Sequence, residues 1–325
     1  MKLLNTYQNG PVTVEIFDDG TKTREWDEIK FGFEPELEFP ESMDIKITNC
    51  CDMGCLFCHE RSIPNGKHGD LKFLQNLFDK SNLPAGIEFA IGGGNPMDCP
   101  GIDEFLDYCK DKGFIINMTM NLNHLLNREK YGNRVVEWLK DNKIKGLGIS
   151  INEKNLKEYA KCDWLWRESN NIVLHVIEGI VDYYDFDSEL CKLQNEYGFI
   201  PKVLILGWKD FGRFGDMSND IKNKTNFKTI DWERNIISFI KRVGRLGGVV
   251  SFDNLAVERL HLLDKLPLKI IDTQYMGKDG THTMYCDLVN KQFTKQSTSK
   301  ERFDIGDKSL RDMYEFVYNN RETIR

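Results

Sequence analysis

The sequence is short of the features that mark several common protein classes. No apolar run approaches the ~20 residues that a membrane-spanning helix needs, and the opening residues Met1-Lys2-Leu3-Leu4-Asn5 do not resemble a secretory signal. Positive charge is in the minority, because 44 Lys and Arg stand against 51 Asp and Glu, giving a net charge of -7 and a pI near 5.5. A surface that follows a nucleic-acid backbone needs the opposite balance. We therefore expect neither a membrane nor an extended nucleic acid as a partner.

Cysteine is present but unevenly distributed. Of nine cysteines, only Cys55 and Cys58 form a C-x-x-C pair, so the two-pair pattern of a structural zinc ribbon is missing. Thiols in a chain without a secretion signal indicate a reducing compartment and not a disulfide scaffold. The predicted localisation is therefore the cytoplasm.

The apolar pattern switches repeatedly between the strand period and the helix period. Repeated strand–helix units predict an α/β fold with a mostly parallel sheet, and right-handed crossovers would curl this sheet into a partial barrel of (β/α)6 type. The predicted strands are 43–48, 87–91, 114–118, 147–151, 172–177 and 202–206, and the predicted helices include 71–78, 102–112, 135–139, 188–197 and 232–243.

Segments of a different pattern flank this core. Residues 12–17 and 21–24 alternate around the turn Asp18-Asp19-Gly20, which predicts an N-terminal β-hairpin. Near the other end, residues 274–281 are typical of a hairpin with 282–288 returning, and 310–317 predict a terminal helix. The expected divisions are residues 1–42 as N-terminal hairpin and connector, 43–253 as the barrel core, and 254–325 as a C-terminal ribbon and helix extension.

The most informative stretch follows the first core strand. Cys51, Cys55 and Cys58 have the spacing C-x3-C-x2-C directly after residues 43–48. Thiolates are soft ligands that favour iron–sulfur clusters or zinc. Three thiolates in one tight loop suit three irons of a cubane and leave the fourth iron free to bind something else. Cys50 would give a different spacing, so we predict that it is not a ligand.

This motif resembles that of the radical S-adenosylmethionine (SAM) superfamily, in which an aromatic residue precedes the last cysteine, as Phe57 does here. The resemblance implies an oxygen-sensitive enzyme with a single 4Fe-4S cluster on the three cysteines and SAM bound at the free iron. An electron from a donor such as flavodoxin or ferredoxin would cleave SAM, and the resulting 5'-deoxyadenosyl radical would abstract hydrogen from the substrate. No second set of cysteines supports an auxiliary cluster, and the C-terminal extension resembles a degenerate form of the cysteine-rich extensions of peptide-modifying members.

The resemblance also implies a SAM site at the carboxyl ends of the strands, where such barrels bind ligands. Gly92, Gly93 and Gly94 follow the second core strand, and Asn95 stands where the family usually has Glu in its Gly-Gly-Glu-Pro segment. An Asn carbonyl can accept a hydrogen bond from the SAM amine without charge assistance. The predicted contacts to the rest of SAM come from the ends of the next two strands, at Asn121 and Ser150.

The substrate is the least determined feature of the sequence. His59, His124 and His175 lie near strand ends or the cysteine loop and are candidate acid–base or substrate-binding groups. We predict a small-molecule or nucleotide-type substrate, because one cluster and a closed pocket are enough for it. The alternative is a peptide or protein maturase, with edge strands that accept an extended peptide. A zinc-stabilised interaction module is the non-enzyme alternative.

Overall fold

The computed structural model describes residues 2–18, 20–32, 35–152, 155–169, 171–198, 200–271 and 279–325. Ten strands form one sheet with the order β10-β9-β8-β7-β6-β5-β4-β11-β12-β13, and three more form a separate antiparallel sheet, β1-β2-β3. Every pairing from β10 to β11 is parallel, whereas β11, β12 and β13 pair antiparallel. The main strands are β4 (Ser42–Thr48), β5 (Glu88–Gly93), β6 (Ile115–Asn121), β7 (Gly146–Ser150), β8 (Ile172–Ile177), β9 (Lys202–Leu206), β10 (Val250–Phe252), β11 (Thr283–Asp287), β12 (Gln292–Thr294) and β13 (Phe303–Asp304).

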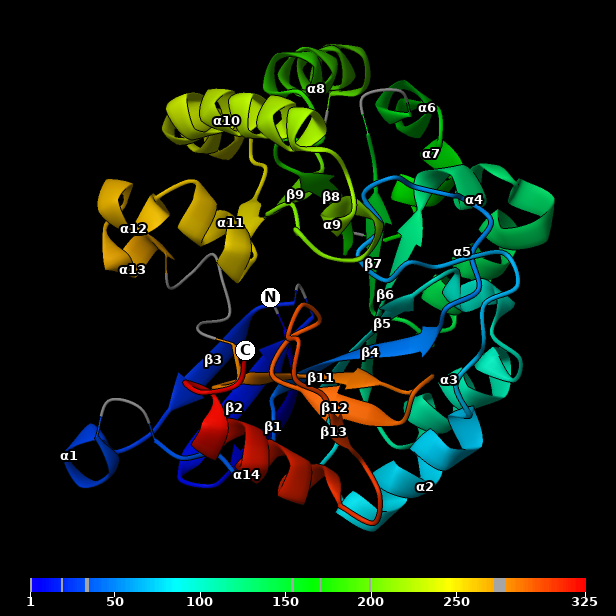
Figure 1. The fold of residues 1–325 in the computed structure, drawn as a ribbon, viewed down its shortest axis with the longest axis vertical. Helices are drawn as coiled ribbons and strands as arrows, with labels where there is room; N and C mark the ends of the chain where they lie inside the picture. The colour runs from blue at the N-terminus through cyan, green and yellow to red at the C-terminus, as the bar shows by residue number, and fades with distance from the viewer. Residues whose placement is uncertain are drawn as a thin grey trace.

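The sheet curves around a central space, and the longer helices lie on its outer face (Figure 1). Asp70 caps the first of these helices by accepting from the amide of Phe73, and Asn82 ends it in the left-handed conformation. The helices are α2 (Leu71–Ser81), α3 (Ile102–Asp111), α4 (Leu122–Leu126), α5 (Asn133–Lys140), α6 (Leu156–Ala160), α7 (Asp163–Trp166), α8 (Tyr183–Tyr197), α9 (Gly212–Gly215), α10 (Asn219–Arg245), α11 (Asn254–Arg259), α12 (Leu262–Lys265), α13 (Leu268–Ile271) and α14 (Leu310–Asn320), with a 3-10 turn η1 (Pro96–Asp98) and a π-helical turn η2 (Arg128–Gly132).

The two faces of the sheet differ in accessibility. Along β5, Phe89 and Ile91 are fully buried, while Glu88, Ala90 and Gly92 between them stay partly accessible. The same alternation runs through β6 and β8. One face therefore packs against the helices, as when the ring of Phe78 stacks on Phe89 with centroids 4.3 Å apart. The other face lines an accessible, largely polar barrel interior.

The predicted α/β partial barrel is confirmed, and several details differ from the sequence prediction. The N-terminal unit has three strands, because β1 (Leu3–Asn9) pairs with β2 (Val12–Phe17), which also pairs with β3 (Lys22–Glu25). The short helix α1 (Glu28–Phe31) follows. Helix α8 begins at Tyr183, five residues before the predicted start, because the Asp182 side chain accepts from the amides of Tyr184 and Asp185.

Another difference lies in the C-terminal extension. The predicted hairpin at 274–281 falls mostly on residues 274–278, which lie outside the described residues. The ribbon that the structure describes is β11, β12 and β13, and β11 also pairs in parallel with β4 through Cys286 and Ile45. The ribbon therefore continues the barrel sheet. The division at residues 42 and 253 stays a prediction. Among the described helices, none combines the length and hydrophobicity of a membrane-spanning segment.

Candidate active site

The cysteine loop begins where β4 ends, at the carboxyl edge of the parallel sheet. Its backbone is anchored at two points: the amide of Cys51 donates to the carbonyl of Ile63 at 2.9 Å, and the carbonyl of Cys50 accepts from the amide of Asn95 at 2.7 Å. Gly54 has a φ of 61° and allows the loop to turn back on itself. Cys51, Cys55 and Cys58 are free, partly exposed thiols. The loop thus presents all three predicted ligands at an accessible edge.

The spacing of the three thiols suits a cluster better than a single ion. Burial raises the pKa of the Cys51 thiol, and the charges of Cys55 and Cys58 raise it further, so the three sulfurs interact. Yet in the described part of the chain they are not a set of donors that all lie within 4.8 Å of one another. A tetrahedral zinc with bonds of about 2.3 Å requires such a set. A cubane does not, because each thiolate binds a different iron.

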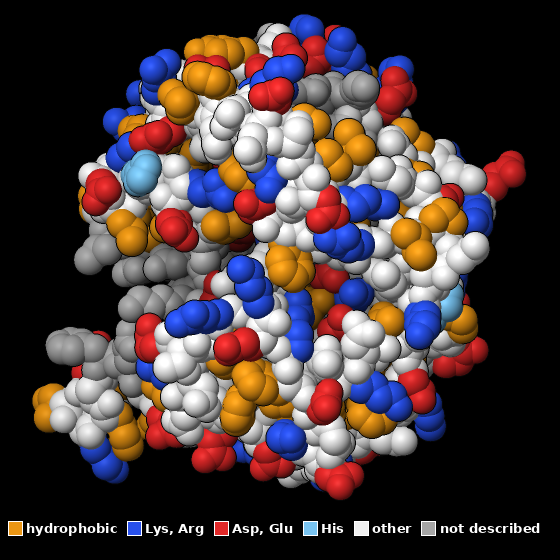
Figure 2. All heavy atoms as spheres, in the orientation of Figure 1, with side chains coloured by type: hydrophobic (Ala, Val, Ile, Leu, Met, Phe, Trp, Pro, Cys, Tyr) orange, Lys and Arg blue, Asp and Glu red, His pale blue; other side chains and the backbone are white. Residues whose placement is uncertain are grey.

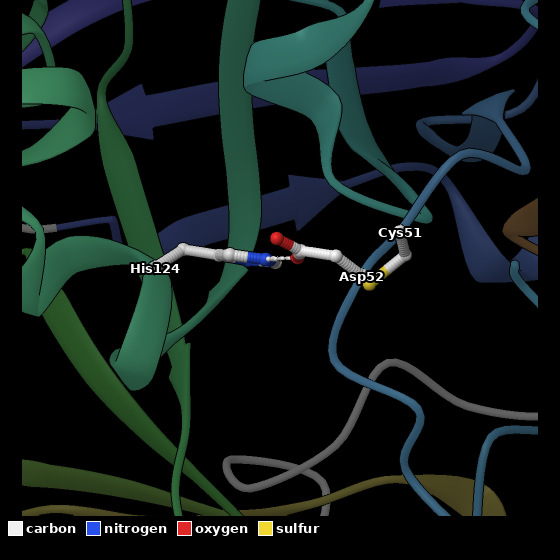
Figure 3. Close-up of side chains that lie close together, drawn as sticks. All are labelled: Cys51, Asp52 and His124. Atoms are coloured by element: carbon white, nitrogen blue, oxygen red, sulfur yellow. Dashed lines mark hydrogen bonds and ion pairs between the residues drawn. The ribbon is translucent and has the colours of Figure 1, made fainter. Parts of the chain in front are cut away.

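A second group of donors adjoins the first cysteine. Figure 3 shows Asp52 pointing toward His124, with the Sγ of Cys51 beside them. The Nε2 of His124 lies 2.7 Å from the Oδ1 of Asp52, and this hydrogen bond is the main cause that lowers the pKa of Asp52. Donor atoms of Cys51, Asp52 and His124 lie within 4.8 Å of one another and could hold a metal ion. His124, a sequence candidate, therefore ties the cysteine loop to α4 and is only 4% exposed.

Cys50 has contacts of its own. Its thiol donates to the carbonyl of Pro64 at 3.0 Å, and its amide donates to the hydroxyl of Thr48 at 3.0 Å. Both partners of Cys50 therefore come from nearby positions in the same stretch of chain. They support the prediction that it is not a cluster ligand, which metal analysis of variants has to test.

The three glycines after β5 have different surroundings. A Cβ on Gly93, whose φ is 110°, would lie 2.4 Å from the carbonyl oxygen of Thr48, and one on Gly94 would lie 2.2 Å from that of Cys50. These two glycines let the loop after β5 approach the cysteine loop. A Cβ on Gly92 would meet nothing within 4 Å. Of the three glycines, Gly92 is therefore the one that leaves open space.

Asn95 is fully enclosed between these loops. Its Nδ2 donates to the Oδ2 of Asp98 at 2.8 Å, and its Oδ1 is buried without a hydrogen-bond partner in the described structure. Asp98 in turn accepts from the hydroxyl of Tyr131. Contact between the Asn95 oxygen and a ligand requires the side chain to turn, because the oxygen is covered. The Asn95 Oδ1 is a hydrogen-bond acceptor without a partner, and the predicted contact with the SAM amine requires such an acceptor.

The remaining sequence candidates form a row along the carboxyl edge of neighbouring strands. Asn121 pairs with Ser150, and Ser150 pairs with His175. The Nδ2 of Asn121 lies 4.0 Å from the Sγ of Cys55, which brings this row to the cysteine loop. Burial lowers the pKa of His175 to about 4, so its imidazole is neutral near pH 7. Phe57 lies half-buried within the loop.

The imidazole of His175 depends on a neighbouring glycine. A Cβ on Gly148 would lie 2.3 Å from the Cε1 of His175, so the ring occupies the space that the glycine leaves. No hydrogen bond joins this ring to the described residues. It is therefore a neutral donor and acceptor in the barrel interior.

Sequence reasoning missed a charged pocket of about 430 Å³ beside His59. The Nζ of Lys46 lies 2.8 Å from Glu60 and 3.3 Å from Asp287. The hydroxyl of Tyr285 donates to Glu60 at 2.8 Å. Burial would raise the pKa of Glu60, but His59 and Lys46 outweigh it and hold that pKa below its usual range. A signal existed, because Lys46 interrupts an apolar strand at an alternate position.

A model of the Radical SAM superfamily matches residues 45–178. No curated protein matches the chain. Among solved structures, SuiB from Streptococcus suis bound to the precursor peptide SuiA is 14% identical with a TM-score of 0.62, covering 91% of this chain and 70% of SuiB. The protein anSMEcpe with bound AdoMet is 12% identical with a TM-score of 0.60, covering 87% of this chain and 83% of that one. A further anSMEcpe structure, with AdoMet and the Cp18Cys peptide, is 12% identical with a TM-score of 0.54, covering 87% and 82%. These likenesses concern the fold.

Proposed function

We propose that this chain, of which residues 45–178 match the Radical SAM superfamily model, is a SAM-dependent iron–sulfur enzyme whose substrate is a peptide or a segment of a protein. The open barrel is the observation that supports a peptide substrate. The described strands end at two unpaired edges, β10 and β13, and the sheet does not close on itself. An extended chain can enter such an interior from the side, and edge strands offer backbone groups to pair with it.

This proposal reverses the order of preference that the sequence suggested. SuiB and anSMEcpe share the fold over most of this chain, and both have been crystallised with peptides. That observation supports the maturase alternative better than the small-molecule substrate. The family assignment also replaces the zinc-stabilised interaction module. The sheet joins the C-terminal ribbon directly to the strand that precedes the cysteine loop, so a substrate resting on the ribbon would lie near the site.

The chain's residues fit the two cofactors of this family. Cys51, Cys55 and Cys58 would hold three irons of the 4Fe-4S cluster, and the open space at Gly92 would accept SAM beside it. When bound and reduced by one electron from an external donor, these groups would supply the radical chemistry that removes a hydrogen atom from the substrate.

The protein orients and encloses these groups. Asn121 and Ser150 would contact SAM from one side, and Asn95 offers its unmet acceptor from the loop after β5. A substrate that covers the open side of the barrel would limit access of water to the reacting atoms. The neutral imidazole of His175, next to Ser150, would contact the substrate. An electron donor of the flavodoxin or ferredoxin type would reduce the cluster from outside.

The test is a peptide-dependent turnover assay. The anaerobically reconstituted protein is incubated with SAM, a reductant and peptides encoded next to its gene, and 5'-deoxyadenosine and peptide mass are measured. We expect one peptide to increase 5'-deoxyadenosine release and to change in mass. The Cys55→Ala variant should do neither, and the Cys50→Ala variant should behave as the wild type.

A second candidate function rests on the charged pocket beside His59. Its volume of about 430 Å³ lies in the range of pockets that enclose small molecules. Its paired charges would suit a small polar substrate. If no peptide stimulates SAM cleavage while a metabolite extract does, the small-molecule function is correct and the peptide proposal is wrong.

A further inference from the structure

The segment after β9 is seated directly on the cysteine loop. Gly212 has a φ of 60°, and a Cβ there would lie 2.3 Å from the carbonyl oxygen of His59 and 2.6 Å from that of Cys58. The amide of the next residue, Arg213, donates to the carbonyl of Cys58 at 3.0 Å. This contact needs a glycine, and it fixes the backbone of Arg213 against a predicted cluster ligand.

The side chain of Arg213 has an unmet charge. Its Nε is buried without a hydrogen-bond partner, and no carboxylate of the described residues forms an ion pair with its guanidinium. Other arginines nearby are paired: Arg61, for example, lies 2.7 Å from Asp216. A partly buried guanidinium without an anion is costly, so such a group usually has a partner.

Arg213 lies beside the cysteine loop. Its amide is 3.0 Å from the carbonyl oxygen of Cys58, so a cation is anchored next to a predicted cluster ligand. Lys209 lies in the same segment, but its ammonium already donates to the hydroxyl of Ser297 at 2.8 Å. Arg213 is therefore the cation of this segment that is anchored to the loop through its backbone and whose Nε lacks a partner among the described residues.

We infer that Arg213 is the counter-charge of the iron–sulfur cluster and stabilises its reduced form. The inference rests on the proposed cluster site. A cluster held by three thiolates is an anion, and an added electron makes it more negative. A fixed cation beside the loop that holds the cluster would favour the reduced state, because net charge and nearby groups set cluster potentials. Arg213 acts only through its positive charge and takes no part in bond breaking.

The test is a redox titration of the reconstituted wild type and of Arg213→Gln and Arg213→Lys, followed by EPR of the reduced cluster without SAM. We expect equal iron content and a more negative midpoint potential in Arg213→Gln, with Arg213→Lys close to the wild type. Arg61→Gln is the matched control, since it removes an exposed and paired guanidinium from the same side, and its potential should not change. Should Arg213→Gln lose the cluster altogether, the proposal requires Arg213→Lys to keep it.

Three outcomes would overturn the proposal. They are an unchanged potential in Arg213→Gln, loss of the cluster from both variants, and a change confined to SAM affinity, which would assign Arg213 to the SAM carboxylate. The experiment distinguishes a failure of the proposed function from a failure of the role assigned to Arg213. If the wild type itself assembles no cluster, the proposed function is wrong; if it does and the variants match its potential, only the role of Arg213 is wrong.

Discussion

Two nearby glycines at the end of β5 lack a side chain for different reasons. Gly94 touches the carbonyl of Cys50, so its missing side chain serves the packing of two loops. Gly92 faces open space, so its missing side chain serves no contact within the described protein. The same residue type is therefore required for loop packing at one position, and at the other it leaves space that the proposed SAM site would use.

Gly92→Ala should weaken SAM binding without destabilising the protein. The new Cβ meets nothing in the protein, so thermal stability and iron content should stay at wild-type values. If SAM occupies this space, its affinity should fall about tenfold, or ~1.4 kcal/mol. Calorimetric titration with SAM on the reconstituted variant checks this. Gly94→Ala should show the reverse pattern, with lower stability of about 1–3 kcal/mol from the forced contact. Unchanged SAM affinity in Gly92→Ala would remove this residue from the cofactor site.

The cysteines of the loop should separate into ligands and one non-ligand. Cys55→Ala should reduce iron to background after reconstitution, because the remaining two thiolates cannot hold a cubane. Cys50→Ala should retain full iron, since it loses only a weak hydrogen bond to Pro64. Metal analysis and the visible absorption spectrum measure both. Retention of stoichiometric zinc in place of iron would instead point to Cys51, Asp52 and His124 as an ion site.

At the scale of elements, a buried carboxyl joins four segments behind the site. Glu178 follows β8 and is fully buried. It accepts from the hydroxyl of Thr229 in α10 and from the amide of Trp208 after β9, at 3.3 Å for the latter. The Nε of Arg259 in α11 lies 3.9 Å away, too far for a hydrogen bond. Burial therefore dominates and raises the pKa of Glu178 to about 7.

This raised pKa predicts a pH dependence of stability. Between about pH 4.5 and 7 the folded protein keeps a proton on Glu178 that the unfolded chain has released, so stability falls as the pH rises through this window. The loss is at most about 3 kcal/mol. Glu178→Gln should remove it and be the more stable protein at pH 8. Urea unfolding from pH 5 to pH 8 tests this, with Glu158→Gln, an exposed carboxyl paired with Lys161, as control. Parallel pH profiles for wild type and Glu178→Gln would contradict it.

At the scale of the whole molecule, Glu41 attaches the N-terminal sheet to the barrel. Its buried carboxylate lies 2.8 Å from the Nη2 of Arg24 on β3, and its amide donates to the carbonyl of His282 just before β11. Burial alone would raise the pKa of Glu41, but hydrogen bonds with His282 and Arg24 outweigh it and lower that pKa to about 2. Figure 1 places the N-terminal sheet beside the ribbon and α14, and Figure 2 shows mixed Lys, Arg, Asp and Glu over this face and around the central hollow.

Glu41→Gln should therefore destabilise the protein by about 3–5 kcal/mol, the usual cost of removing one partner from a buried ion pair. Because the pKa of Glu41 is lowered, this stabilisation is complete above about pH 4.5 and is lost as the pH falls toward 2. The difference between variant and wild type should shrink over the same range. Thermal unfolding at pH 7 and pH 3.5 measures this. Glu38→Gln removes an exposed partner of Arg311 and should cost under about 1 kcal/mol. Equal effects of the two substitutions would show that Glu41 is not the attachment.

The sequence by itself determined the cysteine motif and the alternation of strands and helices. Both are local properties. The spacing of Cys51, Cys55 and Cys58 sets how one loop can present thiols, and apolar periods set which face of an element is buried. The helix starts were less well predicted, as at Tyr183, because a capping side chain such as Asp182 acts outside the apolar pattern.

Only the tertiary structure decided which distant residues meet. Lys46 and Asp287 are 241 positions apart and lie in one buried ion pair because β11 pairs with β4. The backbone of Arg213 meets the carbonyl of Cys58 because the glycine before it, Gly212, allows close contact with the loop. Asn121, Ser150 and His175 form a row because their strands are neighbours in register. Strand order and register depend on packing between segments, and the sequence pattern of any one segment does not contain that information.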